Sequence, residues 1–234
     1  MCGINGIIFK KSEVDFTKIL NMNNMLQHRG PDSKGSMSYK NLLLGHTRLS
    51  ILDTSTKGSQ PMSNDGRFWI VYNGEVYNYL ELKEELVKKN YKFYTNTDTE
   101  VILCAFQEWG VKCFQKFNGE WALAILDKQE NKIIITRDGI GFKPCYIYED
   151  SNFFSFSSEI KPFYSLNENL EFDLENLGVS GETLSYNSKT IFKNIAQLVQ
   201  GRILEIDLIS NQKKLIKWDY PLSNIPKTSA NYKE

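Results

Sequence analysis

The sequence predicts an α+β fold with largely antiparallel sheets. Segments with helical spacing fall between residues 16 and 109, whereas short apolar runs separated by turn residues dominate from residue 121 onward. The regular alternation of strand and helix that builds a parallel sheet is absent. With 234 residues, 41% of them hydrophobic, the chain is long and apolar enough for one large domain with a buried core.

The first predicted elements are a strand, a helix and two further strands. Ile4–Phe9 is an apolar run directly after Gly3 and predicts a buried strand. Residues 16–26 carry apolar side chains at helical spacing and predict a helix that ends before a turn-rich stretch. Residues 42–51 and 68–72 predict strands, separated by a loop rich in Ser, Thr, Gly and Pro.

Two capping signals predict the next helices. Asn78 with Glu81 is a candidate capping box for a helix through residue 87, and Thr97 with Glu100 is another for a helix that ends before Gly110. The polar end of the chain, residues 221–234, is expected to be a linker or a frayed terminus. The remaining expected strands are 121–126, 132–136, 145–148, 153–156, 201–208 and 214–218.

Composition excludes several classes of function. Lys plus Arg and Asp plus Glu both number 28, which gives no indication of nucleic acid or an anionic membrane as a partner. No apolar stretch is long enough to span a bilayer and no signal peptide is present, so a cytoplasmic location is expected. Four cysteines without CxxC spacing and only two histidines argue against zinc or haem, so we expect no metal. Cys104, Cys113 and Cys145 are expected to be small core residues.

Cys2 is the most informative residue in the chain. If Met1 is removed, Cys2 carries a thiol nucleophile and a free α-amine that can act as its base. Such an amine has a pKa of about 7.7–8.0 and a free thiol of about 8.5, so both titrate near working pH, as proton transfer requires. Cysteine is small enough for methionine removal to be expected. An N-terminal cysteine can also be accidental, so its meaning depends on the rest of the chain.

The run Tyr72-Asn73-Gly74-Glu75 follows a predicted strand and precedes a predicted helix. At such a turn, the side-chain amide of Asn73 and the backbone N–H of Gly74 suit an oxyanion hole for a carbonyl under attack. The same Asn-Gly pair is typical of a plain tight turn. The local sequence leaves both interpretations open.

Two charged residues suit the two ends of an amino acid. Arg48, in a predicted strand, suits bidentate binding of a carboxylate. Asp98, in the first turn of a capped helix, suits binding of an ammonium group. Arg48 is also compatible with an ordinary surface position, and Asp98 with a role in the helix cap. Spacing alone does not show that the two converge.

Five motifs follow one another along the chain. They are Cys2-Gly3-Ile4, His28-Arg29-Gly30-Pro31-Asp32, Arg48-Leu49-Ser50-Ile51, Asn73-Gly74-Glu75-Val76-Tyr77-Asn78 and Thr97-Asp98-Thr99-Glu100. This order resembles the class II glutamine amidotransferases, which are N-terminal-nucleophile glutaminases. The later segments Arg137-Asp138, Lys143-Pro144 and Ser157-Ser158-Glu159-Ile160-Lys161 resemble the asparagine-synthetase branch in particular.

The resemblance implies a fold and a reaction. The fold is an αββα sandwich over residues 2–218, with two antiparallel sheets face to face and helices outside, followed by a tail or linker over residues 219–234. In the reaction, Cys2 attacks the side-chain amide of L-glutamine with its own α-amine as base. Ammonia leaves, and water hydrolyses the resulting thioester. The His28 motif is expected to be a structural loop and not a catalytic base.

The resemblance also implies roles for the other site residues. Asn73 and the Gly74 N–H would form the oxyanion hole. Arg48 would bind the α-carboxylate of glutamine and Asp98 its α-ammonium, while Glu75 would orient the same end of the substrate.

The chain departs from the family at three points. It lacks a Ser-Gly-Gly-x-Asp-Ser pyrophosphate loop, so ammonia is expected to pass to a partner synthetase domain or subunit. That partner would use ATP and magnesium, whereas this domain is expected to need no cofactor. Gly119-Glu120-Trp121 stands where the family often has Met or Phe after the glycine, in a region that faces the partner. Leu198-Val199-Gln200-Gly201 replaces a Leu-Pro-Pro-Gly turn.

Two other functions stay open at this level. One is a glutaminase-like module that binds a partner without turnover. The other is an N-terminal-nucleophile amidohydrolase acting on another amide. The second would leave Arg48 and Asp98 unpaired, because an acyl group without a zwitterionic end offers no partner to either charge.

Overall fold

The computed structural model describes residues 1–177, 179 and 188–218. The predicted tail, residues 219–234, lies outside this described part. In chain order the elements are β1 (Gly3–Phe9), α1 (Phe16–Met25), β2 (Ser33–Tyr39), β3 (Leu42–Arg48), β4 (Phe68–Val76), α2 (Tyr79–Lys88), α3 (Asp98–Trp109), β5 (Gly119–Asp127), β6 (Lys132–Arg137), β7 (Tyr146–Glu149), β8 (Phe153–Ser157), β9 (Ile195–Gln197), β10 (Arg202–Asp207) and β11 (Lys213–Lys217), with short 3-10 helices at Thr56–Gly58, Gly110–Lys116 and Lys161–Ser165.

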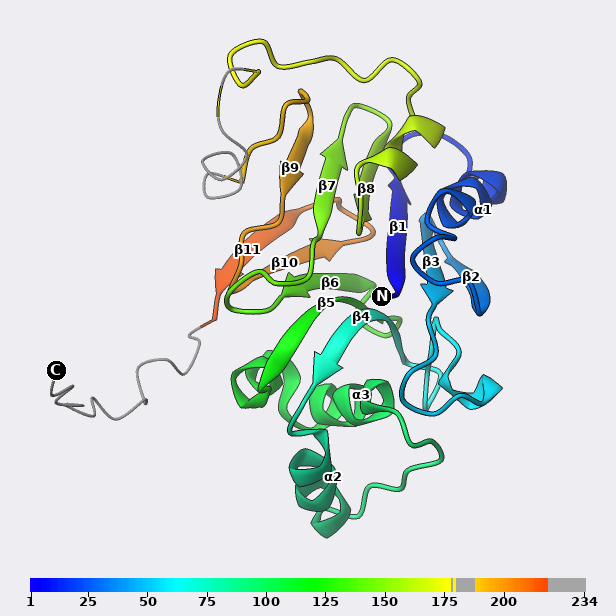
Figure 1. Cartoon of the computed structure of the whole chain (residues 1–234), viewed down its shortest axis with the longest axis vertical. Coiled ribbons are helices and arrows are strands. Elements are labelled where there is room, and N and C mark those ends of the chain that lie inside the picture. Colours follow the sequence, from blue (N-terminus) through cyan, green and yellow to red (C-terminus); the bar gives the residue numbers. More distant parts are fainter. Residues whose placement is uncertain (178, 180–187, 219–234) are drawn as a thin grey trace, which may run out of the picture.

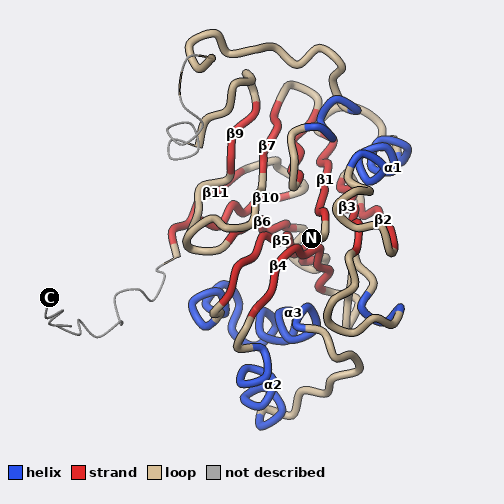
Figure 2. The backbone as a smooth tube through the Cα atoms, viewed as in Figure 1, coloured by secondary structure: helices blue, strands red, loops and turns tan. Residues whose placement is uncertain are grey.

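The strands form two antiparallel sheets, as the sequence predicts. One sheet has the order β2-β3-β1-β8-β7-β9, and the other has the order β11-β10-β6-β5-β4. Helix α1 packs on β1 and β3 of the first sheet, whereas α3 packs on β4 of the second sheet and on α2 (Figure 1). The tube view shows the helices at the outside and the strands between them (Figure 2). The predicted αββα sandwich is therefore confirmed.

Three apolar layers hold the sandwich together. In the middle layer, Ile4 and Ile8 of β1 pack with Ala124 of β5 between the sheets. On the other face of β1, Ile7 packs with Ile19 of α1. A third cluster joins β4 and β5 to α2 and α3. Because both faces of each sheet are covered, these strands are continuous apolar runs instead of alternating ones.

The structure differs from the prediction mainly at the edges of the sheets. Strand β2 was not predicted, because its sequence is polar and its residues are only half-buried. The three-residue β9 was also not predicted. The predicted turn at residues 73–75 is wrong: β4 continues through Val76, since Asn73 pairs with Ala122 of β5 and Gly74 with Trp121.

The two capping boxes have different outcomes. Thr97 caps α3 as predicted, because its hydroxyl accepts a hydrogen bond from Glu100 N at 3.2 Å. Asn78 precedes α2 but does not cap it with its side chain. Instead, its amide bonds Lys116 O at 2.9 Å and Asn118 N at 2.9 Å, so it ties the start of α2 to the segment before β5.

Candidate active site

One open pocket is lined by residues from both sheets. It encloses about 700 Å³ of empty space, open solvent included. The residue before β1, the end of β3, the open edge of β4 and the first turn of α3 all contribute to its wall. Every site residue that the sequence predicts lines it: Cys2, Arg48, Asn73, Gly74, Glu75 and Asp98.

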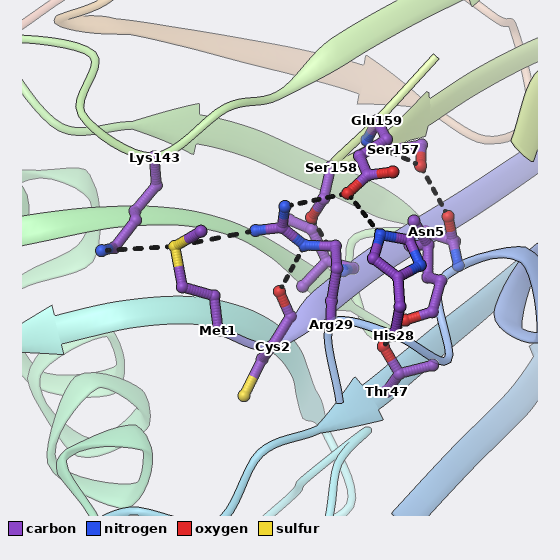
Figure 3. A network of polar contacts seen from close by, with 12 residues as sticks. Met1, Cys2, Asn5, His28, Arg29, Thr47, Lys143, Ser157, Ser158 and Glu159 are labelled. Carbon is purple, nitrogen blue, oxygen red and sulfur yellow. Dashed lines mark hydrogen bonds and ion pairs between the residues drawn. The ribbon is translucent and has the colours of Figure 1, made fainter. Parts of the chain in front are cut away.

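Cys2 is held at both its thiol and its main chain. Leu49 N donates to Cys2 Sγ at 3.4 Å, and the thiol lies 3.6 Å from Leu49 O. Burial raises the pKa of this thiol, while the Leu49 hydrogen bond and the positive charges of the chain terminus and Arg48 oppose the shift. On the other side, Arg29 Nε donates to Cys2 O at 3.0 Å, and Glu159 holds Arg29 at 3.1 Å (Figure 3). A thiol with a raised pKa needs a base nearby to become a thiolate.

Met1 lies at the mouth of the pocket. Its side chain is 56% exposed, and its Sδ lies 3.9 Å from Arg29 Nη2 and 4.0 Å from Lys143 Nζ (Figure 3). While Met1 is attached, the nitrogen of Cys2 belongs to a peptide bond. That nitrogen becomes basic only in a chain that begins at Cys2.

The open edge of β4 directs main-chain groups toward the pocket. Antiparallel strands turn the N–H groups of alternate residues to opposite edges. On the edge of β4 that faces away from β5, Tyr72 N donates to Gln60 Oε1 at 2.6 Å and Val76 N donates to Asp98 Oδ2 at 3.1 Å. The same alternation places the N–H of Gly74, between them, on this edge beside the pocket.

Asn73 and Gly74 have the features of an oxyanion hole. Asn73 is only 1% exposed, and its Nδ2 has no hydrogen-bond partner among the described residues. A buried amide donor without a partner is costly unless a ligand supplies the acceptor. Gly74 must lack a side chain, because a Cβ there would meet the backbone of Glu120 and Trp121. The close contact with β5 thus explains why residue 74 is a glycine, although the chain makes no turn there.

Arg48 is buried in the wall of the pocket and fixed by the loop that follows β3. Nη1 donates to Ser55 O at 2.6 Å, and Nη2 donates to Asp53 O. The side chain is not an ordinary surface arginine, because the residue is only 6% exposed. A guanidinium has five donors, so further N–H groups remain for a carboxylate in the pocket.

Asp98 is the buried anion on the same wall. Its Oδ2 accepts from Tyr72 OH at 2.7 Å and from Val76 N at 3.1 Å. Burial raises the pKa of Asp98, and the nearby Glu75 adds to the rise, while the hydrogen bonds from Tyr72, Val76 and Thr99 oppose it. The pocket therefore offers a cation and an anion of fixed position, which suits a zwitterion.

Several residues around the pocket were given no role in the site from the sequence. Tyr72 and Gln60 support the edge of β4, and neither has a signature that sequence reasoning recognises. Arg29 lies in the His28 motif, whose structural role the Cys2 contact now explains. Glu120 and Lys143 form an ion pair of 3.2 Å at the rim.

The described residues include neither a metal-binding cluster nor a membrane-spanning helix. No group of three His, Cys, Asp or Glu side chains there is placed to hold a metal ion. No helix in that part of the chain has the length and apolar character needed to cross a membrane.

Comparisons with known proteins agree with this geometry. A family model described as "Glutamine amidotransferase domain" matches residues 1–218. The chain is 40% identical to putative asparagine synthetase (glutamine-hydrolyzing) 2 of Methanocaldococcus jannaschii, over 94% of this chain and 47% of that protein. It is 36% identical to asparagine synthetase (glutamine-hydrolyzing) 2 of Bacillus subtilis, over 92% of this chain and 30% of that protein. The chain thus spans less than half the length of these relatives.

A solved structure shows the same fold at lower identity. Glutamine phosphoribosylpyrophosphate amidotransferase from Bacillus subtilis matches 93% of this chain and 49% of its own, with a TM-score of 0.72 and 18% identity. This likeness concerns the fold alone and agrees with the sandwich of two antiparallel sheets. From the family match and the relatives above it follows that the chain belongs to the class II glutamine amidotransferases and is related to the glutamine-hydrolysing asparagine synthetases.

Proposed function

We propose that this chain is a glutaminase domain that hydrolyses the side-chain amide of L-glutamine and supplies ammonia for an ATP-dependent amidation. The observation that carries this proposal is the buried amide of Asn73, which has no hydrogen-bond partner among the described residues and lies in the same pocket as the Cys2 thiol. A buried donor left free beside a nucleophile suits a carbonyl oxygen that becomes an anion during attack.

The proposed reaction begins once Met1 has been removed. The α-amine of Cys2 takes the thiol proton, and Sγ attacks the side-chain carbonyl of glutamine. Asn73 Nδ2 and Gly74 N–H stabilise the oxyanion. The C–N bond then breaks, the protonated α-amine gives its proton to the departing ammonia, and water hydrolyses the γ-glutamyl thioester to release glutamate and restore the thiol.

The other pocket residues would bind the amino-acid end of glutamine. Arg48 would bind the α-carboxylate and Asp98 the α-ammonium, with Glu75 beside Asp98 at the same end. This end gives specificity, because an amide without both charges would leave Arg48 and Asp98 unpaired. No cofactor is needed in these steps.

The acceptor of ammonia is proposed from the relatives. Both asparagine synthetases described above extend well beyond the part that this chain matches. We therefore assign the ATP-dependent step, with its magnesium, to a synthetase domain or subunit that receives ammonia from this one.

Glutamate release from L-glutamine tests the proposal. Wild type should release glutamate, and Cys2→Ala should lose this activity. Cys104→Ala is the matched control, because Cys104 is a buried cysteine outside the pocket. Equal rates for wild type and Cys2→Ala would reject the role of Cys2. Absence of release by wild type, tested with its N-terminus verified to begin at Cys2, would favour a binding module without turnover.

A further inference from the structure

Tyr72 lies beside Asp98 in the wall of the pocket and is not one of the predicted site residues. It lines the pocket, yet it is only 3% exposed. Its hydroxyl donates to Asp98 Oδ2 at 2.7 Å, the same oxygen that accepts from Val76 N. Tyr72 therefore links the edge strand of one sheet to the first residue of α3.

The main chain of Tyr72 is fixed by side chains on the open edge of β4. Its N–H donates to Gln60 Oε1 at 2.6 Å, and His46 Nε2 lies 3.1 Å from its carbonyl oxygen. Burial lowers the pKa of His46 to about 4, so the ring is neutral at pH 7 and Nε2–H is the donor to the carbonyl. Gln60 Nε2 also donates to Thr99 Oγ1 at 3.3 Å, which gives a second link to α3.

We propose that Tyr72 is a positioning residue, which holds the Asp98 carboxylate in the orientation that receives the α-ammonium of the substrate. The inference rests on the proposed function, because it presupposes an amino acid in the pocket. It adds a residue whose hydroxyl acts on the substrate only through Asp98.

The capacity of the carboxylate supports this assignment. An ionised carboxylate accepts about four hydrogen bonds, and Asp98 accepts three, from Tyr72, Val76 and the main chain of Thr99. Capacity for one cationic donor remains. Tyr72 OH and Val76 N both donate hydrogen bonds to Oδ2. These two bonds fix the plane of the carboxylate and therefore the position of Oδ1. Without the hydroxyl, the donors that remain among the described residues are main-chain groups, and they hold a carboxylate whose burial already disfavours its charge.

Tyr72→Phe tests the inference with the removal of one oxygen atom. The ring, its packing and the main-chain bonds to Gln60 and His46 are retained. The KM for glutamine should rise about tenfold, as expected for the loss of one hydrogen bond to a charged group. The kcat should change less than about twofold, since the reacting end is untouched.

Tyr148→Phe is the matched control. Tyr148 is buried, and its hydroxyl donates to the carboxylate of Asp150 at 2.7 Å, but it lies in β7 and does not line the pocket. Both variants lose a 2.7 Å hydrogen bond to a carboxylate, and Tyr148→Phe also loses the bond from Asn167 Nδ2, so the melting temperature of the control should fall at least as much. Only Tyr72→Phe should change KM. If both variants change KM alike, or if Tyr72→Phe lowers kcat and leaves KM unchanged, the inference is wrong.

A double-mutant cycle with Asp98→Asn separates action through Asp98 from direct action. In the Asp98→Asn background, Tyr72→Phe should raise KM less than about twofold. A further tenfold rise would show that Tyr72 acts independently and overturn the inference. If wild type releases no glutamate, the proposed function and this inference fail together. If wild type is active and Tyr72→Phe behaves as wild type, only this inference fails.

Discussion

The two ends of the pocket differ in how their polar groups are satisfied. At the charged end, Arg48 donates to two backbone carbonyls and Asp98 accepts from Tyr72 and Val76. At the thiol end, the buried amide of Asn73 has no partner among the described residues. The charged groups are held in place by the protein before a ligand arrives, whereas the Asn73 amide has no acceptor among the described residues.

This difference agrees with the proposed roles of the two ends: the charged end binds the substrate, and the thiol end carries out the reaction. Groups that only bind are best held rigidly by the protein, because little ordering is then left for the ligand to impose. Donors that act in the transition state are most useful when nothing in the ground state competes for them. An unpartnered buried donor costs about 1–3 kcal/mol of stability, so the thiol end is expected to sacrifice stability for activity.

Asn73→Ala should have the largest effect on activity, and it tests the proposed role of the thiol end. The kcat should fall about 100- to 1000-fold, as for the loss of one oxyanion donor, with a much smaller change in KM. Because Nδ2 has no hydrogen bond to lose within the described part of the chain, the melting temperature should not fall as it does for an ordinary buried polar group. Steady-state kinetics and thermal unfolding of the same preparation check both points. A large loss of stability with nearly normal kcat would contradict the difference between the ends.

Asp98→Asn should have the next largest effect, at the charged end. The substitution removes the negative charge that faces the α-ammonium, and truncating one partner of a buried pair costs at least about 2 kcal/mol. The KM for glutamine should therefore rise at least about thirtyfold, with a smaller change in kcat. Initial rates over a wide range of glutamine concentration measure it. An unchanged KM would show that the ammonium does not bind there.

Gly58→Ala should have a smaller effect, and it tests whether Arg48 must be held rigidly at the charged end. A Cβ at Gly58 would collide with Arg48 Nη2, so the guanidinium must shift away from its carbonyl partners. A misplaced binding group should raise KM about fivefold to tenfold and leave kcat nearly unchanged. Thr56→Ala, a nearby substitution that only shortens an exposed side chain, serves as the control. Normal KM in Gly58→Ala would mean that the position of Arg48 is not critical.

His46 should have the smallest effect on activity, since it touches neither end directly. Its pKa falls from 6.5 to about 4 on burial, so the unfolded chain binds more protons than the folded one between these values. Stability should therefore rise with pH through this window, and its loss on acidification from pH 7 to pH 4 amounts to about 3 kcal/mol from this residue. Urea unfolding of wild type and His46→Gln at both pH values should show the difference. Identical pH dependence in the two would contradict it.

The sequence predicts most of the fold because the buried strands are apolar. Runs such as Ile4–Phe9 and Trp121 to Leu126 are covered on both faces, so hydrophobicity alone reveals them. Edge strand β2 has no such signal, since solvent reaches it. The Asn-Gly pair was interpreted as a turn for a local reason, whereas pairing with β5 decides its conformation.

The sequence predicts the residues that would contact the substrate but not the groups that hold those residues in place. Motifs identify Cys2, Arg48 and Asp98, and the structure brings all three to one pocket. The groups that hold them carry no sequence signal. Tyr72 and Gln60 act through contacts between separate elements, and Arg48 is held by main-chain carbonyls, which every residue has. That these residues lie in one pocket is therefore known from the fold and not from the sequence.

The most direct test of the whole account is the mass of the N-terminal peptide after wild type has been mixed with saturating glutamine and quenched in acid. The prediction is a peptide that begins at Cys2 and carries a γ-glutamyl group on its thiol, with no adduct on Cys104, Cys113 or Cys145. A peptide that still begins at Met1 while glutamate is being released, or an adduct on another residue, would contradict the proposed role of Cys2.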